Sequence, residues 1–324
     1  MKFRLFALIA LFSGTTLLAQ GDFQKGILYY KRGDCQKAIV EFEAIVKSNP
    51  KYEDGYRLLG DCYMRMAKYN EAIDRFSQAL KLRSDLFATY YGLALAYYNI
   101  GKFADTAATL QKGERYIGNF DKYEFYHLRA SALFNSSQYA VAIDDFNRAV
   151  QVRSSKEDFL ALGQAYRQVG NIAAAQNAFK KVLELDPSNA TAQEALGEFD
   201  LKGATELMEQ KKYDDAVAIL SEYVKKNPSK GIGFYALGMA YLYTDKFPEA
   251  EQALLNATRL SPTASAFESL GYVQEQQKKY DEALASYKKA GQLGSTAAAK
   301  NIRRVRELMA QKKASLAMPA KRRG

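Results

Sequence analysis

The sequence predicts an all-α protein built as an array of helical hairpins. The first observation is a pattern of small and bulky apolar residues that recurs about every 34 residues over most of the 324-residue chain. The second is the composition, because six prolines, a mean hydropathy of −0.34 and 13% aromatic residues without tryptophan fit a helical protein. The third is the one large break in the pattern, an excess of seven residues, which adds two helical turns and keeps the apolar face in register.

Each unit of the pattern contains a mostly small residue that is followed four positions later by a bulky apolar one. The first member of this pair falls at Ala38, Ala72, Thr106, Ala142, Ala175, Ala216, Ala250 and Ala283, at spacings of 34, 34, 36, 33, 41, 34 and 33 residues. In the second unit Ala72, Phe76 and Ala79 share one helix face, because they stand at i, i+4 and i+7. Gly60, twelve residues before Ala72, is small where the preceding helix must approach closely. The pattern therefore predicts eight helical hairpins.

These landmarks resemble the tetratricopeptide repeat (TPR) family, whose units combine the same small, aromatic, alanine and proline positions. Four of the units end in proline, at Pro50, Pro187, Pro228 and Pro262. The resemblance implies a right-handed superhelical solenoid of about eight helix-turn-helix repeats, with the first helix of each repeat lining a concave groove that usually binds peptides. The family's usual tryptophan is absent, and Thr106 and Gly113 make the third unit irregular.

Spacing and composition divide the chain into five segments. Residues 1–19 form a predicted signal peptide, residues 20–187 hold repeats one to five, and residues 188–295 hold repeats six to eight. The excess of seven residues predicts a lengthened or kinked joint helix from about Ala190 to Lys211. Residues 296–314 are amphipathic without a paired helix, which predicts a C-terminal capping helix, and residues 315–324 form a predicted flexible basic tail.

The N-terminus has the pattern of an export signal. Lys2 and Arg4 precede an apolar run from Leu5 to Ala19, which is interrupted by SGTT and ends on a small residue. We expect cleavage after Ala19 and a mature chain that begins at Gln20, exported to the periplasm or beyond. The segment LLAQ resembles a bacterial lipoprotein box with glutamine in place of the lipidated cysteine, which implies release without an acyl anchor. The alternative is an uncleaved membrane anchor.

The net charge of +10 belongs to the ends of the chain. The first nineteen residues contribute +2 and residues 300–324 contribute +8, so that residues 20–299 are neutral. A surface that binds nucleic acid would carry its basic residues along the repeats, so this class of partner is disfavoured. The basic tail instead predicts peripheral contact with anionic surfaces.

Catalytic and metal-binding residues are scarce. The chain has one histidine, His127, and two cysteines, Cys35 and Cys62, so a zinc site of the usual Cys and His ligands is disfavoured. Glycines recur where helices pack and form no phosphate-binding loop. We therefore expect the protein not to be an enzyme and to use no cofactor and no small-molecule substrate. Cys35 and Cys62 lie on helices that pack together in a TPR stack, where either a disulfide or two buried free thiols fit.

The segment ATYYGLALAYYNIG at residues 88–101 contains no charged side chain. Leu93 and Ala94 belong to the apolar stack, whereas the resemblance assigns the opposite face to the groove. The residues assigned in this way are Tyr91, Leu95 and Tyr98 of repeat three, His127 and Phe134 of repeat four, and Tyr235, Met239, Leu242 and Tyr243 of repeat seven. Repeat two differs, because it presents Arg57, Asp61 and Arg65 and lacks the Lys/Asn/Arg clamp with which chaperone-binding TPR domains hold a terminal carboxylate.

We therefore expect a non-catalytic scaffold or adaptor of the cell envelope that binds a partner helix or peptide in an apolar, tyrosine-rich groove. A contiguous apolar patch usually marks an interface, although tyrosine also tolerates partial exposure without a partner. The alternative is a structural envelope protein that its basic tail tethers to anionic lipid or polymer.

Overall fold

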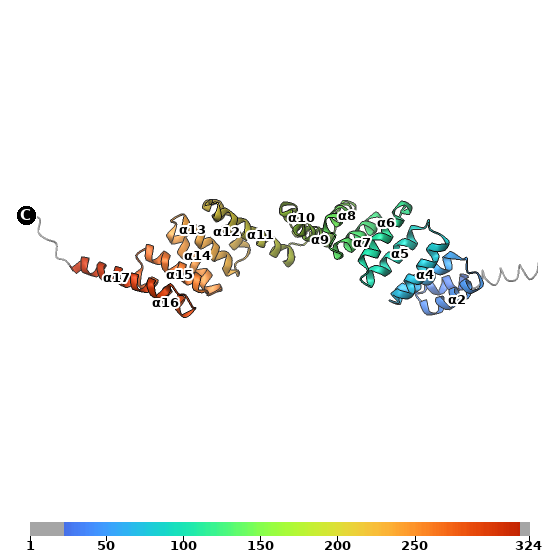
Figure 1. Ribbon diagram of the computed structural model, residues 1–324, viewed down its shortest axis with the longest axis horizontal. Coiled ribbons are helices and arrows are strands. Elements are labelled where there is room, and N and C mark those ends of the chain that lie inside the picture. The colour runs from blue at the N-terminus through green and yellow to red at the C-terminus, as the bar shows by residue number, and fades with distance from the viewer. Residues whose placement is uncertain (1–22, 318–324) are drawn as a thin grey trace, which may run out of the picture. The chain divides into compact units, whose positions relative to one another are not determined.

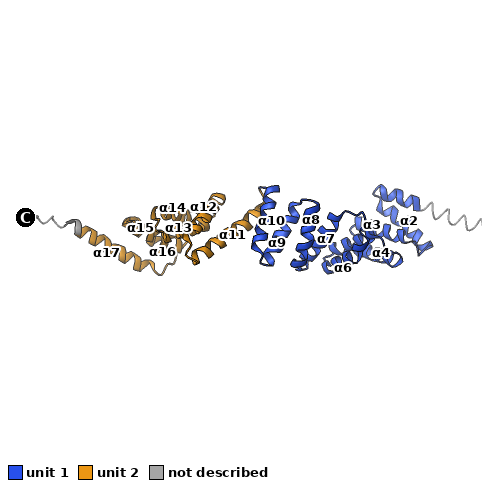
Figure 2. Cartoon of the chain, turned by 90° about the horizontal axis from the view of Figure 1, so that it is seen from above, with its two compact units in different colours: residues 1–187 blue, residues 188–324 orange. Residues whose placement is uncertain are grey.

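The computed structural model describes residues 23–317, with side chains described as far as residue 314, and it divides the chain into two compact units (Figures 1 and 2). Unit 1 ends at Pro187 and unit 2 begins at Ser188. The predicted signal peptide at residues 1–19 lies outside the described residues, as does most of the basic tail. No helix in the described part of the chain is both long and apolar enough to cross a membrane.

Unit 1 consists of five helical hairpins in succession. Residues 23–31 pair with α2 (Cys35–Ser48), and the other pairs are α3 (Glu53–Arg65) with α4 (Tyr69–Leu82), α5 (Phe87–Asn99) with α6 (Phe103–Gly113), α7 (Lys122–Asn135) with α8 (Tyr139–Val152), and α9 (Lys156–Gln168) with α10 (Ile172–Leu185). The short 3₁₀ helix η1 (Glu114–Tyr116) follows α6.

Unit 2 contains three hairpins and a terminal helix. The pairs are α11 (Ala190–Glu209) with α12 (Tyr213–Lys226), α13 (Gly231–Tyr243) with α14 (Phe247–Leu260), and α15 (Ala264–Gln276) with α16 (Tyr280–Gln292). The last helix, α17 (Ala298–Ala317), packs on α16 and extends three residues into the segment predicted as tail. The predicted all-α array of eight hairpins with a capping helix is confirmed over residues 23–317, which contain no strand.

The hairpins pack where a bulky ring meets a glycine. The fully buried Phe76 of α4 lies against Gly60 of α3 and Gly92 of α5. A Cβ atom added to Gly60 would lie 2.7 Å from the Phe76 ring, and one added to Gly92 would lie 2.6 Å from it. Only glycine leaves room for the ring at these two positions, so Phe76 packs its own hairpin against the first helix of the next one.

All eight turns within the hairpins use the same backbone conformation. The turn residue has a positive φ in each case: Gly33, Ala67, Gly101, Ser137, Gly170, Lys211, Asp245 and Lys278. In each of the eight turns the N–H of the residue after the positive-φ residue donates back to a carbonyl five positions earlier, as Lys68 does to Tyr63 at 2.9 Å, which satisfies the end of the first helix. Only three of the eight are glycine, so the pairing of the helices holds the other five in the left-handed region.

The terminal helix is attached through a buried carboxylate. Glu275 of α15 accepts two hydrogen bonds from Arg304 of α17, both 2.8 Å long, and a third of 3.0 Å from the hydroxyl of Tyr287 on α16. Val305 of α17 is fully buried beside Tyr287. The apolar side of α17 therefore closes the last hairpin while Arg304 neutralises the buried charge of Glu275.

We predict that two glycine substitutions will have opposite effects on stability. Gly60→Ala should lower the free energy of unfolding by about 1–3 kcal/mol, because the new methyl group overlaps the Phe76 ring. Gly203→Ala, at a position in α11 where an added Cβ meets nothing within 4 Å, should raise it by about 0.5–1 kcal/mol. Denaturant unfolding of the two variants beside the parent chain measures both values. Equal effects would show that glycine at residue 60 is not required by packing.

Candidate partner-binding surface

The first helix of each hairpin lies on the inner side of its unit. Direct contacts join α3 to α5, α5 to α7 and α7 to α9 in unit 1, and α11 to α13 and α13 to α15 in unit 2. Each of these contacts skips the second helix that lies between them in the sequence. The side of the first helices that faces away from their own hairpins is therefore a continuous surface within each unit, which we call the inner face.

In unit 2 the inner face is apolar and open. The helix α13 contains no charged residue, and it buries Leu237, Gly238 and Ala240 in its own hairpin. On its other side Ile232 is 62% exposed and Tyr243 is 53% exposed, while Tyr235, Met239 and Leu242 are half-buried. Tyr243 rests on Tyr213 of α12, with the two rings stacked at 4.9 Å.

Two residues of this surface were not predicted from the sequence. Ile232 stands three positions before Tyr235 on α13, and Tyr272 of α15, 43% exposed, has the same place in repeat eight as Met239 has in repeat seven. The repeat register contains both positions. Extending the predicted surface by one turn of α13 would have found Ile232, and extending it to the next repeat would have found Tyr272.

In unit 1 the chain itself covers part of the corresponding surface. Tyr91, Leu95 and Tyr98 of α5 are half-buried. Phe120, from the connection between α6 and α7, lies with its ring 4.8 Å from the ring of Tyr91, and burial raises the pKa of Tyr91 to about 12. The charge-free helix α5 therefore packs on its own hairpin with one side and partly on Phe120 with the other.

Other predicted groove residues of unit 1 contact their own hairpin or the next one. The ring of Tyr98 packs edge-on against Phe103 at 5.3 Å, and its hydroxyl accepts a 3.1 Å hydrogen bond from Asn135. Phe134 packs on Tyr139 at 5.2 Å within its own hairpin, so its ring contributes to the core of repeat four as well as to the surface.

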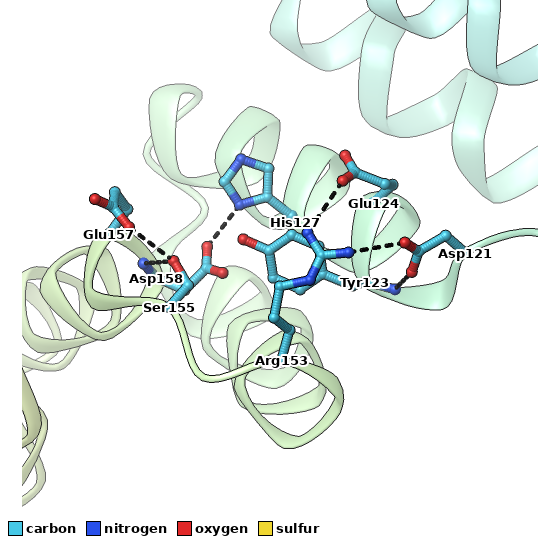
Figure 3. Close-up of polar contacts among 8 residues, drawn as sticks. All are labelled: Asp121, Tyr123, Glu124, His127, Arg153, Ser155, Glu157 and Asp158. Carbon is cyan, nitrogen blue, oxygen red and sulfur yellow. Dashed lines mark hydrogen bonds and ion pairs between the residues drawn. The ribbon is translucent and has the colours of Figure 1, made fainter. Parts of the chain in front are cut away.

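His127 belongs to a polar cluster between α7 and α9 (Figure 3). Its Nδ1 lies 2.6 Å from Oδ1 of the buried Asp158, whose backbone N–H donates to the capping hydroxyl of Ser155. The hydrogen bond to Asp158 raises the pKa of His127, against the opposing effect of burial. Because Asp158 is the third residue of α9, the pair fastens the start of that helix to the middle of α7.

Arg153 holds the other side of this cluster. Its guanidinium lies 3.9 Å from the ring centre of Tyr123, which in turn stacks on His127 at 5.5 Å. Arg153 also donates to Asp121 at 2.9 Å and to Glu124 at 3.4 Å, as Figure 3 shows. These contacts fix the start of α7, because Asp121 is its capping residue.

The charged residues of repeat two engage one another. Arg57 donates to Asp54 at 3.0 Å and to Asp61 at 3.4 Å, and Arg65 donates to the carbonyl of Tyr30. Burial raises the pKa of Asp61 to about 6. Arg57 is therefore paired with two acids of its own helix, whereas Arg65 keeps its charge and is held by Tyr30.

The two cysteines lie together in the first core cluster. Cys35 of α2 and Cys62 of α3 are both buried, and the structure has them as free thiols. Burial raises the pKa of Cys62, so the thiolate is disfavoured there. The disulfide between them stays a prediction. The described residues also contain no group of three or more His, Cys, Asp or Glu side chains placed to hold a metal ion.

Eight helical hairpins in one register, with the first helices of each unit on one inner face, define an α-helical solenoid of helix-turn-helix repeats. A family model described as tetratricopeptide repeat matches residues 23–65, 160–199 and 235–298, and a second, described as TPR repeat, matches residues 66–101. The chain belongs to the TPR family. Proteins of this family generally mediate protein–protein interactions and act as scaffolds, and they are typically non-catalytic.

Individual relatives are distant. A TPR repeat-containing protein of Methanocaldococcus jannaschii is 25% identical over 292 residues, which cover 82% of this chain and 50% of that protein. Hsp70-Hsp90 organizing protein 1 of Glycine max is 25% identical over 235 residues, covering 71% and 39%. The chain thus spans half or less of the length of these two relatives. A solved structure of Naa15/Naa10 bound to HypK-THB shares the fold, with a TM-score of 0.56 at 18% identity over 86% of this chain and 43% of that one.

We predict that His127 titrates above its usual pKa near 6.5, because Asp158 stabilises the imidazolium. A pKa that is raised on folding adds stability below about pH 6.5, and this stability is lost as the pH rises through the folded-state pKa. NMR titration of the imidazole signals, on protein without a histidine tag, reads this group alone because the chain has one histidine. Asp158→Asn should return the pKa to 6.5 or below. An unchanged value in that variant would remove Asp158 as the cause.

Proposed function

We propose that this chain is an exported, non-catalytic adaptor that binds a helix or peptide of a partner protein on the inner face of unit 2. The observation that carries the proposal is the open apolar surface of Ile232, Tyr243 and Tyr272, on two neighbouring first helices. The helix α13 has no charged side chain with which to face water on this side.

Burial of this surface by a partner is favourable because apolar area leaves water. Tyrosine suits such a site, since a rigid ring provides a large contact area and its hydroxyl tolerates exposure before binding. Tyr235, Met239 and Leu242 on the same side of α13 are half-buried, and Tyr235 and Leu242 pack against the core cluster of α14 and α15, so they extend the apolar surface inward. The Glycine max relative is named for organizing Hsp70 and Hsp90, but repeat two here lacks the carboxylate clamp predicted for chaperone partners, so we propose a different partner.

A second candidate function is tethering to an anionic surface by the C-terminal region. On α17 Lys300, Arg303, Arg306 and Lys313 are exposed, against a single exposed acid, Glu307. Each basic residue near an anionic membrane contributes about 1 kcal/mol, and the attraction decays within a Debye length. Tethering and partner binding use different parts of unit 2, so they can be separated by deletion.

We predict that the inner face can be disrupted without loss of the fold. Peptides selected from a random phage-displayed library on the parent chain should bind Ile232→Ser and Tyr272→Ser at least tenfold more weakly, because truncated hot-spot residues cost about 2 kcal/mol or more. The melting temperature should change little, since both side chains are exposed.

Two controls accompany this measurement. Leu255→Ser changes a residue of the second helix α14 that is 49% exposed, and it should leave peptide binding intact. A chain that lacks residues 315–324, and with them Lys321, Arg322 and Arg323, should also bind the peptides normally. If the second function also holds, this deletion should weaken binding to anionic vesicles, and charge reversal of Arg303 and Arg306 on α17 should weaken it further. Clones that bind every variant equally would place the binding surface elsewhere.

Export is the part of the proposal that rests on the N-terminal sequence. After expression with residues 1–19 in place in a Gram-negative host, the protein should be recovered from the periplasm with Gln20 as its first residue. Intact-mass analysis of the purified chain reads the cleavage site. Recovery of a chain that still begins at Met1 or Lys2, or retention in membranes after a high-salt wash, would contradict export by a cleaved signal.

A further inference from the structure

The connection between α6 and α7 places an aromatic side chain of the protein on its own inner face. The ring of Phe120 lies 4.7 Å from that of Phe87 and 4.8 Å from that of Tyr91, with interplanar angles of 61° and 48°. These are the distances and inclined orientations that aromatic pairs prefer. Phe87 and Tyr91 stand four residues apart on α5, so together they form one two-sided seat for a ring.

This connection is longer than those at the regular repeat spacings, and its backbone makes only local hydrogen bonds. The repeat spacing here is 36 residues, whereas five of the other six are 33 or 34. Within it, the N–H of Phe120 donates to the carbonyl of Ile117 and that of Ile117 to Glu114, and Gly118 supplies a positive φ. No hydrogen bond joins residues 117–120 to α5 in the described part of the chain. Side-chain packing therefore holds the connection against α5: Tyr116 stacks on Tyr90 at 6.0 Å, Ile117 packs on the same core cluster as Phe87, and Phe120 contacts Phe87 and Tyr91.

The end of the connection is fixed independently of Phe120. Asp121 accepts a 2.9 Å hydrogen bond from Arg153 and another of 2.9 Å from the N–H of Tyr123, which caps α7 (Figure 3). A movement of Phe120 away from α5 thus leaves the start of α7 anchored. Gly118 and Asn119 can absorb the change, because both are exposed and an added Cβ at Gly118 has no neighbour closer than 3.8 Å.

We propose that Phe87 and Tyr91 form a binding site for an aromatic side chain of an extended partner segment, and that Phe120 occupies this site in the free protein. Phe120 indicates that the ligand is an aromatic side chain, since Phe87 and Tyr91 already bind a phenyl ring from an irregular segment. The proposal rests on the proposed function in taking the inner face as a binding surface. A partner must compete with Phe120, whose tether gives it an effective concentration in the millimolar range.

The test compares Phe120→Ala with the parent chain. The probe is a blocked synthetic peptide with the sequence IGNFDK of residues 117–122, and its control carries alanine in place of phenylalanine. Shifts of the α5 amide signals in NMR report binding. Phe120→Ala should bind the phenylalanine peptide at least tenfold more tightly than the parent chain does, and it should not bind the alanine peptide. Adding Tyr91→Ala to Phe120→Ala should abolish the gain.

Stability separates this role from a purely structural one. Phe120→Ala should melt close to the parent chain, whereas Phe134→Ala, a half-buried aromatic that packs within its own hairpin, should melt early and gain no peptide binding. Early melting of Phe120→Ala, or normal melting without a gain in peptide binding, would overturn the proposal. Either result leaves the surface of unit 2 untouched, because that surface is tested with substitutions in α13 and α15.

Discussion

The array depends on bulky side chains that fill the space left by small residues on neighbouring first helices. Phe76 shows the constraint most directly, because its ring contacts Gly60 in its own hairpin and Gly92 in the next. One side chain therefore sets both the distance within a hairpin and the distance between hairpins. This double contact explains why the small and bulky positions keep their spacing along the chain, and why the first helices end up side by side.

The repeats could be predicted from the sequence because the packing constraint recurs. The counterparts of Ala72 and Phe76 predict a second helix in each repeat. The lengthened helix α11 follows from a repeat spacing that is two helical turns longer than the usual one. Phe120 could not be predicted, because it lies in a connection outside the repeat register. Neither could the pair of His127 and Asp158, since the two stand 31 residues apart and meet only because α7 and α9 are neighbours.

Two helices of similar composition thus have different surroundings. Both α5 and α13 lack charged side chains, and both bury one side in their own hairpins. Their sequences are alike in composition, so the groove residues predicted from the sequence come from both helices. In the structure Phe120 covers Tyr91 on α5, whereas Ile232 and Tyr243 on α13 stay exposed. The difference comes from the connection that follows each hairpin and not from the helices themselves.

The shared conformation of the eight turns has a consequence for how such a chain can change. In every repeat the residue of positive φ stands five positions before the alanine or threonine of the second helix, as Ala67 does before Ala72. The hairpin interior therefore tolerates no change of length. The spacing of 36 residues departs from the pattern in the connection after α6, between two hairpins. The spacing of 41 residues departs from it in α11, the first helix of a hairpin. Insertions and deletions at those places can give a repeat protein new surfaces while the paired helices keep their register, so the chain can diversify by length as well as by substitution.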